Sequence, residues 1–156
     1  MFDETKIEII DSKAIPNTLE NGYKTRDILY VKGKYLDELI HIFVNHWPSN
    51  YGGREKALPK RKTTANLHLE HIFEIQKINK NSEIILIGDF NENPNEQNIQ
   101  LLKKHGLSSL MEPMVGKPKI GTYVYRGKDY LYDQIIVNEG LQDQMNLIVV
   151  LESIQI

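Results

Sequence analysis

Two short polar motifs carry side chains able to act on a phosphate ester. The first is Gly88-Asp89-Phe90-Asn91, which follows the apolar run Ile84–Ile87. If that strand continues to Asn91, its two-residue period points Asp89 and Asn91 to the same side. A carboxylate and an amide placed together can orient one water molecule or one phosphate. The structural alternative is that both side chains cap a turn by bonding to nearby backbone.

The second motif is Asn45-His46-Trp47-Pro48-Ser49, which ends an alternating segment that we expect to be a strand. An imidazole at position 46 can donate to an anionic oxygen or transfer a proton near neutral pH. The structural alternative is a histidine that is hydrogen-bonded to backbone beside the single tryptophan of the chain.

Further charged side chains are candidates for binding an anion or orienting a catalytic group. Cations gather between Arg54 and Lys62, including Arg61, where a glycine-containing loop precedes an expected helix N-terminus, a place that suits anions. Arg26 opens an expected hairpin, and a guanidinium can bind a phosphate through two N–H groups. Asp133 interrupts an apolar strand, so it needs a fixed partner or a cleft to face. A solvated face and ordinary ion pairs are the structural alternatives.

Composition limits the class of protein that holds these residues. The chain has 156 residues, 40% of them hydrophobic and 26% charged, which is typical of one soluble globular domain. Its net charge of −2 excludes a polyanion binder held by bulk charge, and no basic–aromatic stripe demands nucleic acid. The absence of cysteine excludes disulfides, thiolate metal sites and cysteine nucleophiles. We expect no membrane-spanning segment and no signal peptide, and the sequence indicates neither a compartment nor an oligomeric state.

The elements that must position these residues alternate between strand and helix patterns. Strands are predicted at Lys6–Ile10, Arg26–Val31, Glu38–His46, Ile84–Ile87, Thr122–Tyr125, Tyr132–Asn138 and Leu147–Leu151. The second and third form a hairpin across a turn at Lys32–Lys34, and two later strands join around Arg126–Asp129. Helices are predicted over Arg61–Asn79, after the long loop Trp47–Lys60, and over Asn95–Gly106. This pattern predicts an α/β or α+β fold with a largely covered sheet.

Taken together and in this order, the motifs resemble the endonuclease/exonuclease/phosphatase superfamily, to which deoxyribonuclease I belongs. The residues that carry the resemblance are Arg26-Asp27, Asn45–Ser49, Gly88–Asn91 and the segment from Gly121-Thr122-Tyr123 to Asp133–Val137. The resemblance implies part of a four-layer α/β/β/α sandwich of the deoxyribonuclease I type. It also implies a phosphoesterase dependent on Mg²⁺ or Mn²⁺, nuclease-like, that hydrolyses a phosphodiester by in-line attack of water. Nucleic acid, phospholipid and inositol phosphate are all open as substrates.

The resemblance also assigns roles to individual residues. It implies that Asp89 orients or deprotonates the attacking water, that Asn91 holds the phosphate or a metal-bound water, and that both contribute to a metal site. It implies that His46 donates to a non-bridging phosphate oxygen and that Asp133 orients a further histidine. Three more positions match residues near the substrate phosphate: Arg26, Asn45 and Arg61.

Two parts of the family pattern have no counterpart in this sequence. We find neither the asparagine and metal-binding glutamate of the family's first strands nor the Ser-Asp-His of its last strand. Residues 1–156 are therefore expected to form one domain of this type that is incomplete at both ends. The alternative function is a catalytically inactive remnant of the fold that acts as a binding or interaction module.

Overall fold

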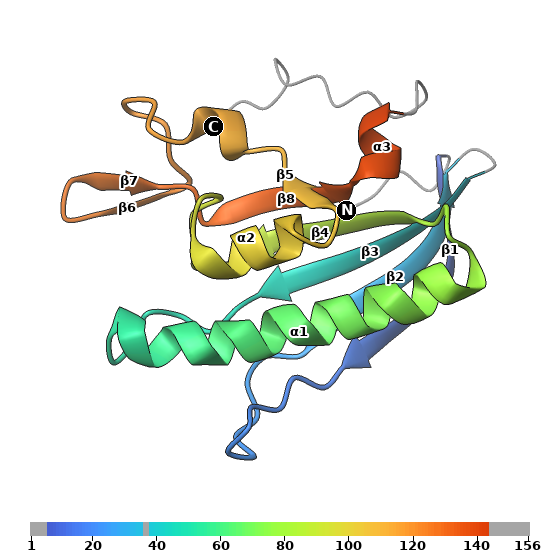
Figure 1. Ribbon diagram of the computed structural model, residues 1–156, viewed down its shortest axis with the longest axis horizontal. Helices are drawn as coiled ribbons and strands as arrows, with labels where there is room; N and C mark the ends of the chain where they lie inside the picture. The colour runs from blue at the N-terminus through green and yellow to red at the C-terminus, as the bar shows by residue number, and fades with distance from the viewer. Residues whose placement is uncertain (1–5, 36–37, 144–156) are drawn as a thin grey trace.

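The computed structural model describes residues 6–35 and 38–143 and contains one large mixed sheet. Its strands are β1 (Ile7–Ile15), β2 (Ile28–Tyr35), β3 (Glu38–His46), β4 (Glu83–Asp89), β5 (Leu107–Ser109) and β8 (Asp133–Asn138). They lie in the order β1-β2-β3-β4-β8-β5 (Figure 1). β3 and β4 pair in parallel, which brings their carboxyl ends to the same edge of the sheet.

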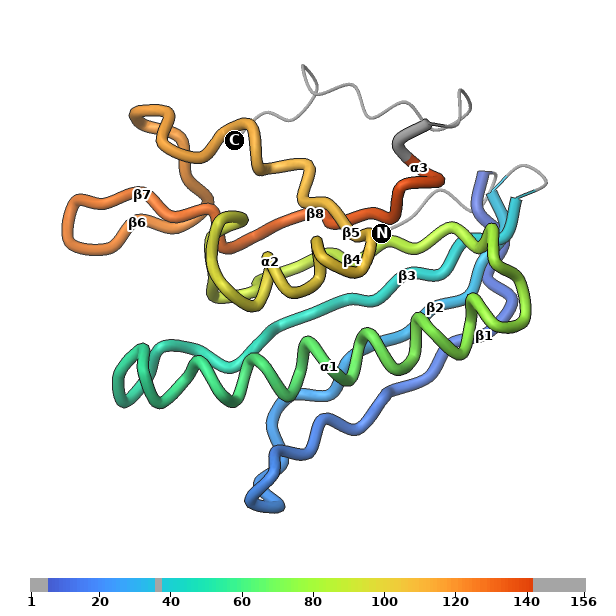
Figure 2. Tube along the Cα trace, in the orientation of Figure 1, coloured from blue at the N-terminus to red at the C-terminus, as the bar shows by residue number. Residues whose placement is uncertain are grey.

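Two helices, α1 (Arg54–Ile78) and α2 (Gln97–Lys103), cover one face of this sheet. They lie beside each other across the strands, as the Cα trace shows (Figure 2). Apolar side chains from both helices enter one core with the sheet, among them Ala65, Ile72, Ile99, Leu102, Phe43, Leu86 and Ile136. We call this the helix-covered face. Two short segments, η1 (Glu112–Met114) and α3 (Glu139–Asp143), follow β5 and β8 respectively.

A two-stranded ribbon, β6 (Tyr123–Tyr125) and β7 (Lys128–Tyr130), projects beyond the sheet. It extends from the end at which β3 and β4 finish and α1 begins (Figure 1). Arg126 and Gly127 connect its strands with φ angles of +50° and +73°. Positive φ at both central residues is the requirement of a type I′ turn, whose twist matches the flanking strands.

The α/β class predicted from the sequence is confirmed, and the sheet with its helix layer supplies part of the expected sandwich. The predicted hairpin is also confirmed, because β2 and β3 pair antiparallel. The turn predicted at Lys32–Lys34 is wrong, because β2 continues through Gly33 to Tyr35. Gly33 lies opposite a register shift between Ile9 and Asp11 of β1, where a Cβ would be 3.1 Å from a backbone oxygen. This glycine therefore marks a close approach of two strands.

Other boundaries differ from the sequence prediction. α1 begins at Arg54, seven residues before the predicted start, and contains Pro59 inside the helix. The predicted loop before α1 is correspondingly shorter. β6 pairs with β7 instead of with β8. The predicted strand Leu147–Leu151 lies outside the described residues. Within the described ranges, no helix is both long and apolar enough to cross a membrane.

Candidate active site

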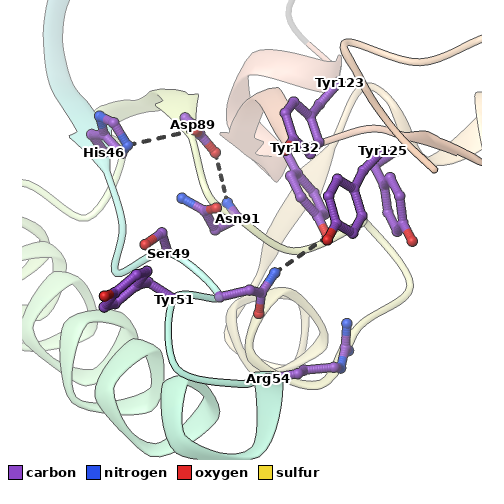
Figure 3. A pocket seen from close by; sticks show the side chains of 11 residues that line it. His46, Ser49, Tyr51, Arg54, Asp89, Asn91, Tyr123, Tyr125 and Tyr132 are labelled. Carbon is purple, nitrogen blue, oxygen red and sulfur yellow. Dashed lines mark hydrogen bonds and ion pairs between the residues drawn. The ribbon is translucent and has the colours of Figure 1, made fainter.

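The site begins where β3 and β4 end side by side. Their parallel register pairs His46 with Asp89, the last residue of each strand. His46 Nε2 lies 3.6 Å from Asp89 Oδ2, and the two side chains are 48% and 33% exposed (Figure 3). The structure thus places the imidazole and the carboxylate of the two motifs together at the accessible carboxyl ends of two central strands.

Gly88 allows these two strand ends to approach each other. Its φ is +123°, and a Cβ at this position would overlap the carbonyl oxygen of Asn45. The parallel pairing continues one residue further, because the Trp47 N–H donates to the Asp89 carbonyl oxygen at 2.8 Å. A side chain at position 88 would therefore separate the two motifs.

Asn91 reaches the same site by a turn and not by strand alternation. β4 ends at Asp89, and Asn91 has a φ of +52°, so the condition that the strand continues to Asn91 is not met. The Asn91 backbone N–H donates to Asp89 Oδ1 at 2.8 Å, and its side-chain amide donates to the Trp47 carbonyl oxygen at 3.0 Å. Turn capping and a position at the site are thus compatible, and the turn fixes one oxygen of Asp89.

A cavity of about 620 Å³ opens in front of these residues (Figure 3). It is lined by His46, Ser49, Asn50, Tyr51, Arg54, Asp89, Asn91, Tyr123, Tyr125, Tyr130 and Tyr132. Arg54 Nη1 donates to Glu96 Oε1 at 2.8 Å, and this hydrogen bond raises the pKa of Arg54. Burial, with Glu96 nearby, raises the pKa of Tyr132 to about 12. At neutral pH the cavity therefore presents a fixed cation and a protonated phenol to an anion.

Asn45 does not reach this cavity, which corrects its predicted contact with the phosphate. Its side chain is buried on the helix-covered face, and its Nδ2 donates to the Phe43 carbonyl oxygen at 2.8 Å. Its Oδ1 lies 2.6 Å from Nε2 of the buried His68, whose Nδ1 lies 2.8 Å from the Thr64 carbonyl oxygen. Burial without a counter-ion lowers the pKa of His68 to about 4, although both ring nitrogens face oxygen acceptors. Asn45 is therefore a packing residue between β3 and α1.

Arg61 is also a structural residue, which corrects its predicted position at the phosphate. Its side chain is 0% exposed, and Nε donates to Oε1 of the equally buried Glu92 at 2.8 Å. Its Nη1 donates to the Pro48 carbonyl oxygen at 3.0 Å and to Asn50 Oδ1 at 3.1 Å. Arg61 thus holds the loop that lines the cavity, without facing the cavity itself.

Arg26 lies in an adjoining cavity of about 530 Å³. Two further cations, Lys24 and Lys60, line the same cavity, and Ser49 and Tyr51 line both cavities. Arg26 is exposed. It is therefore placed next to the His46–Asp89 cavity and not inside it.

Asp133 is exposed at the start of β8, so its carboxylate can be solvated and does not require the fixed partner or cleft expected for a buried acid. It is the antiparallel partner of Asp89, and directly opposed residues project from the same face of a sheet. His46, Asp89 and Asp133 therefore form one row across β3, β4 and β8. Among the described residues, no histidine is placed as the partner expected for Asp133.

The donor set can be compared with the requirements of a divalent metal. In the described ranges, no group of three or more His, Asp or Glu side chains is arranged to hold a metal ion. Asp89, Asn91 and Asp133 nevertheless offer hard oxygen atoms at one sheet edge. Magnesium commonly binds through one or two carboxylates and completes its shell with water and substrate phosphate. The oxygen donors fit that mode of binding, and they do not form a closed protein cage.

Two groups of cavity residues were not singled out from the sequence as site residues. In the sequence, Arg54 is one of several neighbouring charges, and the predicted helix begins only at Arg61. The tyrosines at 123, 125, 130 and 132 form one wall of the cavity. Their i, i+2 spacing and the cations between them were the available signal. The expectation that the chain has no basic–aromatic stripe is therefore wrong.

Solved structures with the same fold come from functionally different proteins. The human Nocturnin catalytic domain with bound sulfate superposes with a TM-score of 0.68 at 18% identity, covering 88% of this chain and 50% of that one. The mannosyl-6-phosphatase of Bacteroides thetaiotaomicron gives 0.66 at 19% identity, covering 88% and 55%. D. rerio TDP2 complexed with a single-strand DNA product gives 0.61 at 12% identity, covering 86% and 54%. The chain thus spans about half the length of these proteins.

The family itself is shown by a sequence model. A comparison with curated proteins found no match. The model of the endonuclease/exonuclease/phosphatase family, in contrast, matches residues 1–155, nearly the whole sequence. These residues include both motifs that meet at the cavity. This chain belongs to the endonuclease/exonuclease/phosphatase family.

Proposed function

We propose that this chain is a divalent-metal-dependent phosphodiesterase, nuclease-like, in which His46 and Asp89 act on the same phosphate. The observation that carries this proposal is that His46 Nε2 lies 3.6 Å from Asp89 Oδ2, at the solvent-accessible carboxyl ends of β3 and β4. Family membership supports a phosphoester as the substrate. Arg54, which is ion-paired with Glu96, lines the same cavity and is 45% exposed there, so its remaining N–H groups can donate to the phosphate.

The proposed reaction is in-line hydrolysis of one P–O bond. Asp89 accepts a proton from the attacking water, whose oxygen forms a new bond to phosphorus while the bond to the alcohol breaks. The alcohol oxygen leaves with a proton from solvent. A ring N–H of His46 donates to a non-bridging oxygen as negative charge develops there. The Asn91 N–H that binds Asp89 Oδ1 keeps the other carboxylate oxygen directed to the cavity.

The proposal includes Mg²⁺ or Mn²⁺ held by Asp89 and Asn91, with Asp133 opposite Asp89 as a further carboxylate. When bound, such an ion supplies positive charge that stabilises the phosphate in the transition state. Because the protein donors are few, we expect weak affinity in the absence of substrate.

Hydrolysis of bis(4-nitrophenyl) phosphate with and without Mg²⁺ or Mn²⁺ tests the proposal. Asp89→Asn keeps the shape of the side chain and removes its basicity, so we expect a rate loss of about 10²–10⁴. Asp11→Asn, on β1 at the far edge of the sheet, is the matched control and should retain the wild-type rate. Metal-dependent turnover that is unchanged in Asp89→Asn would refute the assignment.

A second candidate function is the inactive binding module. The observation that favours it is the absence, among the described residues, of a cluster of three metal-binding side chains. Titration calorimetry with MnCl₂ on the folded protein separates the two. Heat of binding that disappears in Asp89→Asn supports the enzyme, whereas a folded protein without any binding or turnover supports the module.

A further inference from the structure

The tyrosine ribbon presents an ordered aromatic surface to the cavity. Tyr123 and Tyr125 project from the same face of β6, with ring centroids 6.4 Å apart and planes 10° apart. Tyr123 also stacks on Tyr132, at 5.6 Å and 16°. Tyr123 and Tyr125 are 47% and 49% exposed, so their rings are not consumed by the core (Figure 3). Exposed near-parallel rings provide stacking platforms for another planar ring.

Cations accompany these rings on the ribbon. Lys128 is the antiparallel partner of Tyr125, so both project from the same face. The Arg126 guanidinium lies 5.2 Å from the centre of the Tyr125 ring. Residues 117–130 contain Lys117, Lys119, Arg126 and Lys128 against the single carboxylate Asp129, in a chain whose net charge is −2. This local charge is complementary to a polyanion that carries aromatic rings.

A second basic surface lies on the opposite side of the His46–Asp89 pair. Lys24, Arg26 and Lys60 line the adjoining cavity, which has no acidic residue in its lining. Tyr51 is 91% exposed and lines both cavities, so the two adjoin at this residue. The proposed reactive phosphate position is therefore flanked by an aromatic–basic surface and by a purely basic one.

We propose that this chain binds single-stranded nucleic acid along a track from the tyrosine ribbon, past His46 and Asp89, to the groove of Lys24, Arg26 and Lys60. Bases stack on Tyr123 and Tyr125, and backbone phosphates contact the cations of the groove. A duplex is excluded from this mode, because its bases are already stacked and cannot reach the rings. The inference rests on the proposed function only for the position of the cleaved phosphate.

Binding is measured by fluorescence anisotropy with fluorescein-labelled 12-mers in EDTA, so that no hydrolysis intervenes. The ligands are dT12, rU12, a strand of the same length with abasic sites, and a duplex. We expect the single strands to bind more tightly than the abasic strand and the duplex. The dT12 and rU12 arms distinguish DNA from RNA. Replacing both tyrosines (Tyr123→Ala, Tyr125→Ala) should raise the Kd roughly 10-fold or more, whereas the Phe variants retain the wild-type Kd.

The basic groove is tested by salt dependence. Arg26→Ala with Lys60→Ala should reduce the slope of log K against log[salt] by about 1.4, as expected for two lost phosphate contacts on a single strand. Lys80→Ala, beyond the end of α1, is the control and should keep the wild-type slope. Circular dichroism melting verifies that each variant is folded.

Equal affinity for the abasic strand, or an unchanged Kd in the Ala variants, would overturn the inference. Tighter binding of the duplex would do the same. These outcomes are independent of catalysis. Hydrolysis of the small diester without strand binding refutes the track and leaves the proposed function intact, whereas strand binding without hydrolysis refutes the proposed function alone.

Discussion

Polar residues that are neighbours in the sequence differ in burial and hydrogen bonding between the two faces of the sheet. Asn45 and His46 are adjacent in β3, so strand alternation directs them to opposite sides. On the helix-covered face, Asn45 is 6% exposed and its oxygen and nitrogen are both hydrogen-bonded. On the other face, which we call the open face, His46 is half exposed and contacts Asp89 at 3.6 Å. Polar side chains whose hydrogen-bonding groups are paired inside the protein stabilise the fold. Those that remain accessible to solvent are available for chemistry.

Apolar residues show the same contrast. Phe43 and Leu86 are 0% exposed under the helices, whereas Val44 and Ile135, on the open face, are each 37% exposed. α1 and α2 both lie on the helix-covered face, and the short α3 approaches the open face only at the start of β4, where a Cβ at Gly140 would lie 3.3 Å from Glu83 Oε2. Substitutions should therefore change stability on the helix-covered face and activity on the open face.

The largest expected effect is on the buried ion pair of the helix-covered side. Arg61→Met leaves the Glu92 carboxylate buried without its partner, so we expect a loss of about 3–5 kcal/mol in the free energy of unfolding. Urea unfolding followed by circular dichroism measures it. The matched variant Arg54→Met breaks a partly exposed pair with Glu96 and should cost no more than about 1 kcal/mol. Equal losses would show that burial does not separate the two pairs.

Acid should lower the free energy of unfolding of the protein through His68, which is buried on the helix-covered face. Burial lowers its pKa to about 4, so the unfolded chain binds the proton more readily than the folded one. Its contribution is complete above pH 6.5 and is lost as the pH falls toward 4, with a total of about 3 kcal/mol. Unfolding free energies measured from pH 7.5 to 4 in wild type and His68→Gln test this. A variant with the same pH slope as wild type would contradict it.

The adjacent pair Asn45 and His46 offers the most direct comparison. Asn45→Ala removes the partner of His68 and of the Phe43 carbonyl, so we expect a stability loss of about 1–3 kcal/mol. His46→Ala should change stability by less than about 0.5 kcal/mol and lower the rate of diester hydrolysis about 10²–10³-fold. Thermal melts and initial rates are compared for both variants. The reverse pattern would overturn the assignment of structural and chemical roles.

The smallest effect is expected at Val44 on the open face. Val44→Thr should change the free energy of unfolding by no more than about 0.5 kcal/mol, because this side chain already contacts solvent. Urea unfolding provides the measurement. A loss above about 1 kcal/mol would show that this face is covered in solution, and would contradict its description as open.

Much of the fold was predictable because its signals are local. The alternation of β3 and the apolar run of β4 identified both strands, and the motifs at their ends identified His46 and Asp89. The paired row with Asp133 depends on register between distant strands. Turn geometry mattered as well, because a type I′ turn at Arg126 and Gly127 pairs β6 with β7 and builds the tyrosine wall.

The sequence alone determined the family, the α/β class and the two motifs, since residue types and two-residue periods are written in neighbouring positions. Only the tertiary structure decided which polar residues are buried and hydrogen-bonded within the protein. Arg61 and Asn45 have the chemistry of phosphate ligands, yet contacts with Glu92 and His68, far along the chain, bury them. Exposure is set by what packs against a residue, and that depends on segments that meet only in the folded chain.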